Sequence, residues 1–161
     1  MINQEEILKK RLLKLKIHYS ALREYKLYIE KMLSEKDIYD EAIFLELQTY
    51  EKAVLEAYLK RFASIQDFLG DKIFNLLFQV AGINCSKMSE VLYNAEREKI
   101  IDSLQNWIEL REIRNELEHD YPDKLRKALE DLKFCVNSFD LLETYYSNSL
   151  DFAKRYINEI I

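Results

Sequence analysis

Two arginines, an asparagine, a histidine and a tyrosine gather in residues 109–122. Within this segment Arg114, His119 and Tyr121 follow the spacing Arg-x4-His-x-Tyr. A histidine suits proton transfer near neutral pH, because its pKa lies there. An arginine offers fixed donors and a permanent charge to a group that becomes negative during a reaction. The residue types therefore suit proton transfer beside an oxyanion.

The helix that carries this segment is predicted to open at Asp102 and to end near His119, since Pro122 pushes Tyr121 out of helical geometry. Successive residues of a helix are about 100° apart, so residues that share one side can be read from the sequence. On one side of this helix the residues are apolar at the start and ionisable towards the end, which is typical of a cleft or an interface. Arg114 lies about 140° from His119 around the helix axis. The two side chains therefore meet only if the helix end unwinds, or if a second chain contributes one of them. The expected stripe comprises Leu104, Trp107, Ile108, Arg111, Asn115, Glu118 and His119, with Arg114 at its edge and Ile113 and Leu117 on the opposite side.

An ordinary charged helix end is the alternative interpretation of the same residues. Glutamates can pair with Arg111 and Arg114, and a protonated His119 can complement the helix dipole. Residues 109–123 also hold six carboxylates and only two arginines, so the local electrostatic potential is unfavourable for binding a polyanion. Positive charge for a nucleic acid would have to come from Lys9-Lys10-Arg11 with Lys14 and Lys16, a run that is otherwise a solvated helix face.

The segment resembles the signature of the HEPN superfamily, and within it the HepT-type toxins that pair with minimal nucleotidyltransferases. The resemblance rests on Arg114-Asn115, on His119-x-Tyr121 and on the approach Ile-Ile-Asp-Ser-x3-Trp-x2-Leu-Arg in residues 100–111. It implies the toxin of a type VII-like toxin–antitoxin system, a metal-independent endoribonuclease. In such an enzyme an RNA 2′-OH attacks the neighbouring phosphate in a cleft formed across a twofold dimer.

The resemblance also implies a role for each residue of the motif. His119 is expected to be the general acid and base, Arg114 to stabilise the transition state, and Asn115 and Arg111 to support RNA binding. Tyr121 is the position at which the partner nucleotidyltransferase, the antitoxin, would attach AMP. No metal and no cofactor are expected. Two other interpretations stay open: a non-catalytic HEPN subunit that binds nucleotide or substrate for such a transferase, and a structural helical dimerisation module.

The composition predicts an all-α fold in a single domain, residues 1–161. Tight turns favour glycine and proline, and the chain has only two glycines and one proline. Long helices joined by short loops are therefore expected. The hydrophobic periodicity predicts an antiparallel bundle of about five helices and a twofold homodimer. The predicted helices span about 3–34, 37–82, 87–99, 102–119 and 123–160. Either Asp37 or Asp40 can cap the second, which Gly70 either breaks or bends, and Gly82 is expected to end it.

Other features of the chain exclude several kinds of site. No apolar run approaches the roughly 20 residues that cross a bilayer, and no signal peptide is evident, so a cytoplasmic protein that does not enter membranes is expected. Cys85 and Cys135 have no metal-ligand spacing. His18 is expected to be structural or exposed. A net charge of −5 argues against broad nucleic-acid binding, and no glycine-rich phosphate loop is present.

Overall fold

Long helices form the body of the molecule, which we describe from a computed structural model covering residues 3–120 and 123–158. Over these ranges the fold is all-helical, as the composition predicts. The α-helices are interrupted by one π-helical turn, η1, which joins two of them. The elements are α1 (Gln4–Glu35), α2 (Glu41–Leu45), α3 (Thr49–Phe68), η1 (Leu69–Ile73), α4 (Phe74–Val80), α5 (Met88–Arg97), α6 (Leu104–Asp120), α7 (Leu125–Asn137) and α8 (Phe139–Lys154).

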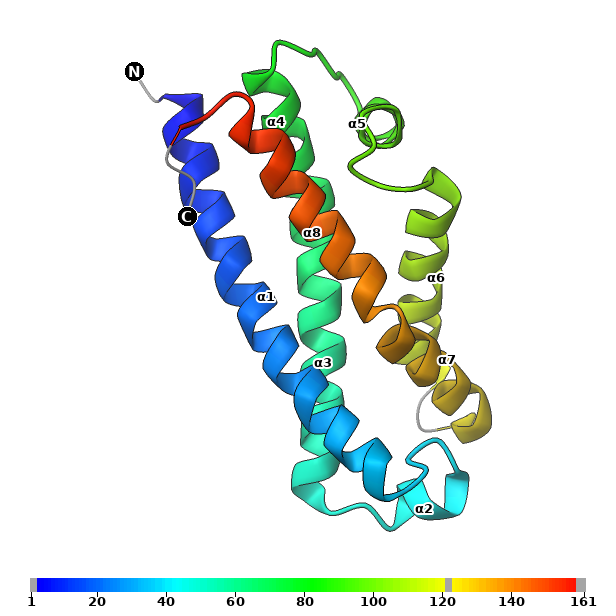
Figure 1. Ribbon diagram of the computed structural model, residues 1–161. Helices are drawn as coiled ribbons and strands as arrows, with labels where there is room; N and C mark the ends of the chain where they lie inside the picture. Colours follow the sequence, from blue (N-terminus) through cyan, green and yellow to red (C-terminus); the bar gives the residue numbers. More distant parts are fainter. Residues whose placement is uncertain (1–2, 121–122, 159–161) are drawn as a thin grey trace.

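The helices pack as a bundle (Figure 1). The unit α3–η1–α4 runs alongside α1, and α8 packs on both α1 and α4. The short α5 crosses the others, and α2 covers one end. Helix α6, which carries the motif, lies against α7 and α3. The site helix is therefore held from two sides by neighbours in the bundle.

Several helix ends lie where the sequence predicts them. The Asn3 side chain accepts a hydrogen bond from the Glu5 amide at 3.0 Å, and Asp40 accepts one from the Ile43 amide at 3.1 Å. Gly82 follows α4 with a positive φ of 80°, the conformation that favours glycine after a helix. These ends need only local groups, which is why their positions are readable from sequence.

Two of the predicted helices are broken, and those predictions were wrong. The second is interrupted over 46–48, because a new helix starts where the Gln48 amide donates to the buried Glu51 carboxylate at 2.9 Å. The last is divided into α7 and α8 at Ser138, and the chain leaves α8 after Lys154. The Ser138 hydroxyl donates to the Phe134 carbonyl at 2.7 Å, a bond that bends helices.

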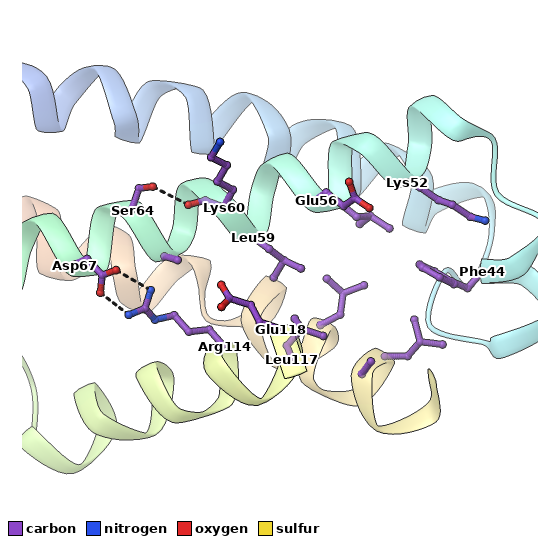
Figure 2. A pocket seen from close by; sticks show the side chains of 15 residues that line it. Phe44, Lys52, Glu56, Leu59, Lys60, Ser64, Asp67, Arg114, Leu117 and Glu118 are labelled. Atoms are coloured by element: carbon purple, nitrogen blue, oxygen red, sulfur yellow. Dashed lines mark hydrogen bonds and ion pairs between the residues drawn. The ribbon is translucent and has the colours of Figure 1, made fainter. Parts of the chain in front are cut away.

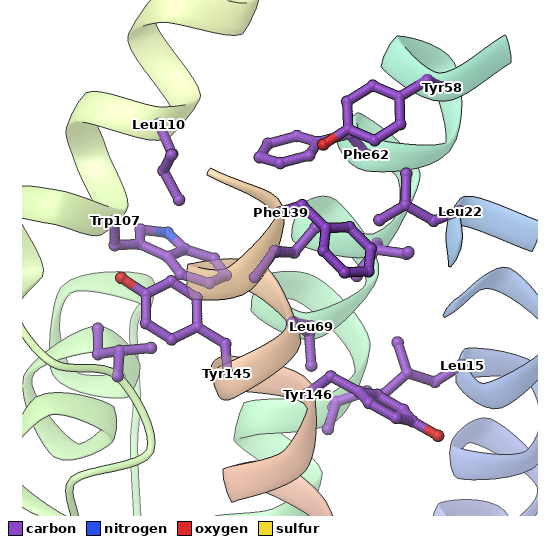
Figure 3. Close-up of a cluster of buried hydrophobic side chains, with 14 of the residues drawn as sticks. Leu15, Leu22, Tyr58, Phe62, Leu69, Trp107, Leu110, Phe139, Tyr145 and Tyr146 are labelled. Atoms are coloured by element: carbon purple, nitrogen blue, oxygen red, sulfur yellow. The ribbon is translucent and has the colours of Figure 1, made fainter. Parts of the chain in front are cut away.

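The core of the bundle is built around Gly70 and Trp107. Gly70 does not end its helix but lies in η1, where a Cβ would come within 3.2 Å of the Trp107 indole. The buried indole lies 5.2 Å from the Phe74 ring and 5.7 Å from the Tyr145 ring, measured between centroids. Figure 3 shows Trp107 beside Tyr145. Gln66 donates to the Trp107 carbonyl at 2.9 Å. The absence of a side chain at Gly70 thus lets α6 approach α3 closely.

None of the described helices is long and apolar enough to span a membrane. Both cysteines are free, and Cys135 is fully buried. Burial raises the pKa of the Cys135 thiol to about 12, so this thiol is not a nucleophile near neutral pH.

We expect Gly70→Val to lower the free energy of unfolding by about 1–3 kcal/mol, because the added side chain overlaps the Trp107 indole. Urea unfolding followed by fluorescence measures this directly, since Trp107 is the single tryptophan. The matched control is Ala53→Val on the exposed side of α3, for which we expect a loss of about 0.5 kcal/mol. Equal stability of Gly70→Val and the natural protein would contradict the close approach.

Candidate functional site

The start of α6 is fixed by Ser103 and Asp102. The Ser103 hydroxyl accepts from the Asn106 amide at 3.0 Å, so Ser103 caps the helix, and the prediction that Asp102 caps it was wrong. Asp102 instead accepts from the Tyr145 hydroxyl at 2.5 Å, a contact with α8. Burial and this hydrogen bond raise the pKa of Tyr145 well above its ordinary value. The Tyr145–Asp102 bond anchors the start of the site helix to α8.

The buried side of α6 is not the one predicted from sequence. It comprises Trp107, Leu110, Arg114 and Leu117, whereas Ile108 is 41% exposed. Leu117 shares this side with Trp107 instead of opposing it. The difference arises because Leu110 and Leu117 continue the stripe from Trp107, while Arg114 packs its aliphatic stem among them. The ionisable residue within the apolar stripe is therefore Arg114, and not Arg111.

Arg114 is held by Asp67 of α3 in a two-pronged ion pair (Figure 2). Its Nη1 donates to Asp67 Oδ2 at 3.3 Å, and its Nη2 donates to Asp67 Oδ1. Arg114 is 8% exposed, but the Asp67 side chain is 56% exposed. The buried Nε of Arg114 has no hydrogen-bond partner among the described residues. The guanidinium thus lies just beneath the surface, with a carboxylate between it and solvent.

A pocket of about 410 Å³ opens beside this ion pair, between α3, α6 and α7. Its walls are largely apolar, and charged side chains lie along it. Arg114, Asp67 and Lys60 are among its lining residues, whereas His119 is not. The apolar part of the lining includes Phe44, Leu55, Leu59, Leu117, Leu129 and Leu132.

The other motif residues lie on the solvent side of α6. Arg111, Asn115 and His119 are all exposed, which agrees with their predicted position on one face of the helix. Arg111 lines a small crevice that Asp67 also lines. The helix is intact through Asp120, so it does not unwind before His119. Tyr121 lies outside the described residues.

Lysines at the start of the next helix neutralise part of the acidic surroundings. Lys124 pairs with Asp120 at 3.8 Å, and Lys127 pairs with Glu116 at 3.8 Å. Two of the carboxylates in residues 109–123, Asp120 and Glu116, therefore have cationic partners. Both carboxylates lie within about one helical turn of His119. In the described ranges, no three His, Cys, Asp or Glu side chains are grouped as metal ligands.

Asp67 is the residue of this site that the sequence does not reveal. It lies 47 positions before Arg114, and no motif or periodic pattern links the two. The one available signal is a carboxylate that immediately precedes the half-buried Phe68 near the end of a long amphipathic helix. Only the packing of α6 on α3 brings Asp67 beside the motif.

We expect Asp67→Asn to lower the free energy of unfolding by about 1–3 kcal/mol, because Arg114 would keep a buried charge without a carboxylate partner. A urea double-mutant cycle with Arg114→Met should give a coupling energy of about 1 kcal/mol or more. The control is Asp71→Asn, an exposed carboxylate one turn further along, for which we expect a change within about 0.5 kcal/mol. If Asp67→Asn and Asp71→Asn are equally stable, the ion pair does not hold α6.

Comparison of the chain with protein-family models, with curated proteins and with solved structures gives no match. The resemblance to the HEPN superfamily therefore rests on the residues of 100–123 themselves.

Proposed function

We propose that the protein is a metal-independent endoribonuclease of the HepT type that acts as a twofold dimer. The proposal is supported by one observation: Arg114 and His119 lie on different sides of α6, and the end of this helix is intact. Arg114 is buried against Asp67, and His119 is exposed about 140° away around α6. One chain cannot bring both groups to one phosphate without unwinding α6, but two chains facing each other can.

The reaction that fits these groups is attack of an RNA 2′-OH on the adjacent phosphorus. The new bond joins the 2′ oxygen to phosphorus, and the bond from phosphorus to the 5′ oxygen breaks. His119 takes the proton of the 2′-OH and returns a proton to the departing 5′ oxygen, which leaves a 2′,3′-cyclic phosphate and a 5′-OH. The arginine supplies fixed donors to the phosphorane as its charge grows.

The surroundings of Asp67 support phosphate binding at this position. Asp67 pairs with Arg114, so a phosphate that displaces the carboxylate would meet the Arg114 guanidinium, and the exposed Arg111 lines the same crevice as Asp67. Because Asp67 is more than half exposed, displacing it costs less than breaking a fully buried pair. Asn115, one turn beyond Arg111 on the exposed side, is suited to orient the phosphate or the histidine.

We further propose, from the motif alone, that the activity is that of a toxin. A partner nucleotidyltransferase would serve as the antitoxin by attaching AMP to Tyr121. The added phosphate would bring bulk and negative charge next to His119, which disfavours a polyanionic substrate.

The second candidate is a non-catalytic HEPN subunit that binds nucleotide or substrate for such a transferase. One observation favours it: Arg114 is already neutralised by Asp67 and lines a 410 Å³ pocket large enough for a small molecule. In this interpretation the pocket holds a ligand, and His119 carries out no chemistry.

RNA cleavage in EDTA separates the two candidates. We expect the natural protein to cut RNA and His119→Ala to lose about 10²–10⁴-fold in rate, because proton transfer is removed. Gel analysis of a labelled single-stranded RNA, with detection of the cyclic phosphate end, measures this. Gln105→Ala, an exposed change on the first turn of α6, should cleave normally. Cleavage by His119→Ala at the normal rate would refute the proposed chemistry, and nucleotide binding without any cleavage would favour the second candidate.

A further inference from the structure

Five basic residues lie where α1 runs alongside α3 and η1. We call this group the cationic seam, and it consists of Arg11, Lys14, His18, Arg61 and Lys72. The three residues of α1 recur every three or four positions, so they share one side of that helix. The span from Arg11 to His18 is roughly 10 Å along the helix axis, at 1.5 Å per residue.

Neutral groups hold the seam in place. Arg11 Nη1 donates to the Lys72 carbonyl at 2.7 Å, and Arg61 Nη1 lies 2.6 Å from His18 Nδ1, which accepts from it as a neutral ring. Lys14 Nζ lies 5.5 Å from the centroid of the Phe68 ring. These contacts order the side chains of Arg11, Lys14 and Arg61 without neutralising their charge, whereas Lys72 takes part through its backbone carbonyl.

No carboxylate pairs with a seam residue in residues 3–120 and 123–158. Basic residues elsewhere do find such partners: Lys9 pairs with Glu6 at 3.6 Å, and Lys36 with Glu51 at 2.7 Å. Asp71, next to Lys72, is the carboxylate nearest to the seam along α3 and η1, and it is exposed. Burial, then the charges of Arg61 and Lys14, lower the pKa of His18, so both charges acting on this ring are positive.

The basic run that stands out in the sequence is therefore not one surface. Arg11 and Lys14 belong to the seam, whereas Lys9 pairs with Glu6. Lys16 follows Lys14 by two positions, which is about 200° around the helix. The arginine and lysine that complete the seam come from α3 and η1, far away in the sequence.

We propose that the cationic seam binds the sugar–phosphate backbone of single-stranded RNA. Unpaired, ordered cations on a chain of net charge −5 mark a place where polyanion binding is favourable. Lys60, which precedes the seam residue Arg61 on α3, lines the Arg114 pocket, and in Figure 2 its ammonium points away from Arg114. The choice of RNA as the polyanion rests on the proposed ribonuclease function.

The seam is suited to reading phosphates and not bases. Phe68, an aromatic residue that adjoins the seam, is half-buried, with Lys14 over the ring and the His18 ring tilted against it at 6.0 Å. The ring is therefore not a free platform on which a base could stack. Binding at the seam is expected to be independent of sequence and strongly dependent on salt.

The test is binding of a fluorescent, single-stranded 2′-O-methyl RNA over a series of salt concentrations. This probe lacks the attacking hydroxyl, so binding is measured whether or not the protein cleaves RNA. For Lys14→Gln/Arg61→Gln we expect binding at low salt to weaken about tenfold or more. A plot of log binding constant against log salt concentration has a negative slope. We expect this slope to become less negative by about 0.7 for each phosphate that the variant no longer neutralises. The double variant Lys14→Arg/Arg61→Lys keeps the charges and should bind normally.

The control for net charge is Lys31→Gln/Lys154→Gln, which changes exposed lysines away from the seam and should keep the natural slope. Equal RNA binding by the seam variant and this control would overturn the proposal that the seam binds RNA. The proposal would also be overturned if the seam variant lost binding to anionic lipid vesicles but kept its binding to the oligonucleotide. Cleavage of RNA in EDTA with unchanged binding by the seam variant would reject the seam alone. Seam-dependent binding without cleavage would reject the ribonuclease function alone.

Discussion

The close approach of α6 to the end of α3 and to Gly70 of η1 is the constraint on which the site depends. The missing side chain at Gly70 admits the Trp107 indole, and Gln66 fixes the Trp107 backbone from the same helix. Two turns further along α6, the Arg114–Asp67 ion pair joins the same two helices. These contacts set the rotation of α6 about its axis. A different rotation would put other motif residues in the interior.

That rotation decides what each motif residue can do. Because Trp107 faces the core, Arg114 faces it too, and Arg111, Asn115 and His119 face solvent. The arginine is thereby fixed and partly neutralised, and the histidine is accessible. An enzyme built this way needs a second molecule to complete its site, whereas a ligand-binding subunit does not. The same geometry thus makes the oligomeric state part of the functional question.

Local signals in the sequence predict much of the fold. The all-helical class, the starts at Asn3 and Asp40 and the end at Gly82 follow from side chains that act on their own backbone. The break at Ser138 was missed because serine is tolerated inside helices and bends them only in some packing environments. Asp67 was missed because its role depends on a tertiary contact. The motif was visible, but the face of α6 that is buried was not.

Mixing two inactive variants tests the central claim, that Arg114 of one chain acts with His119 of another. Arg114→Met and His119→Ala chains would be inactive separately. After they are mixed, unfolded together and refolded, half of the dimers would pair one chain of each kind, and one of the two sites in each such dimer would be intact. We therefore expect the mixture to cleave RNA in EDTA at about a quarter of the natural rate. A mixture as inactive as its components, although mixed dimers are detected, would contradict it.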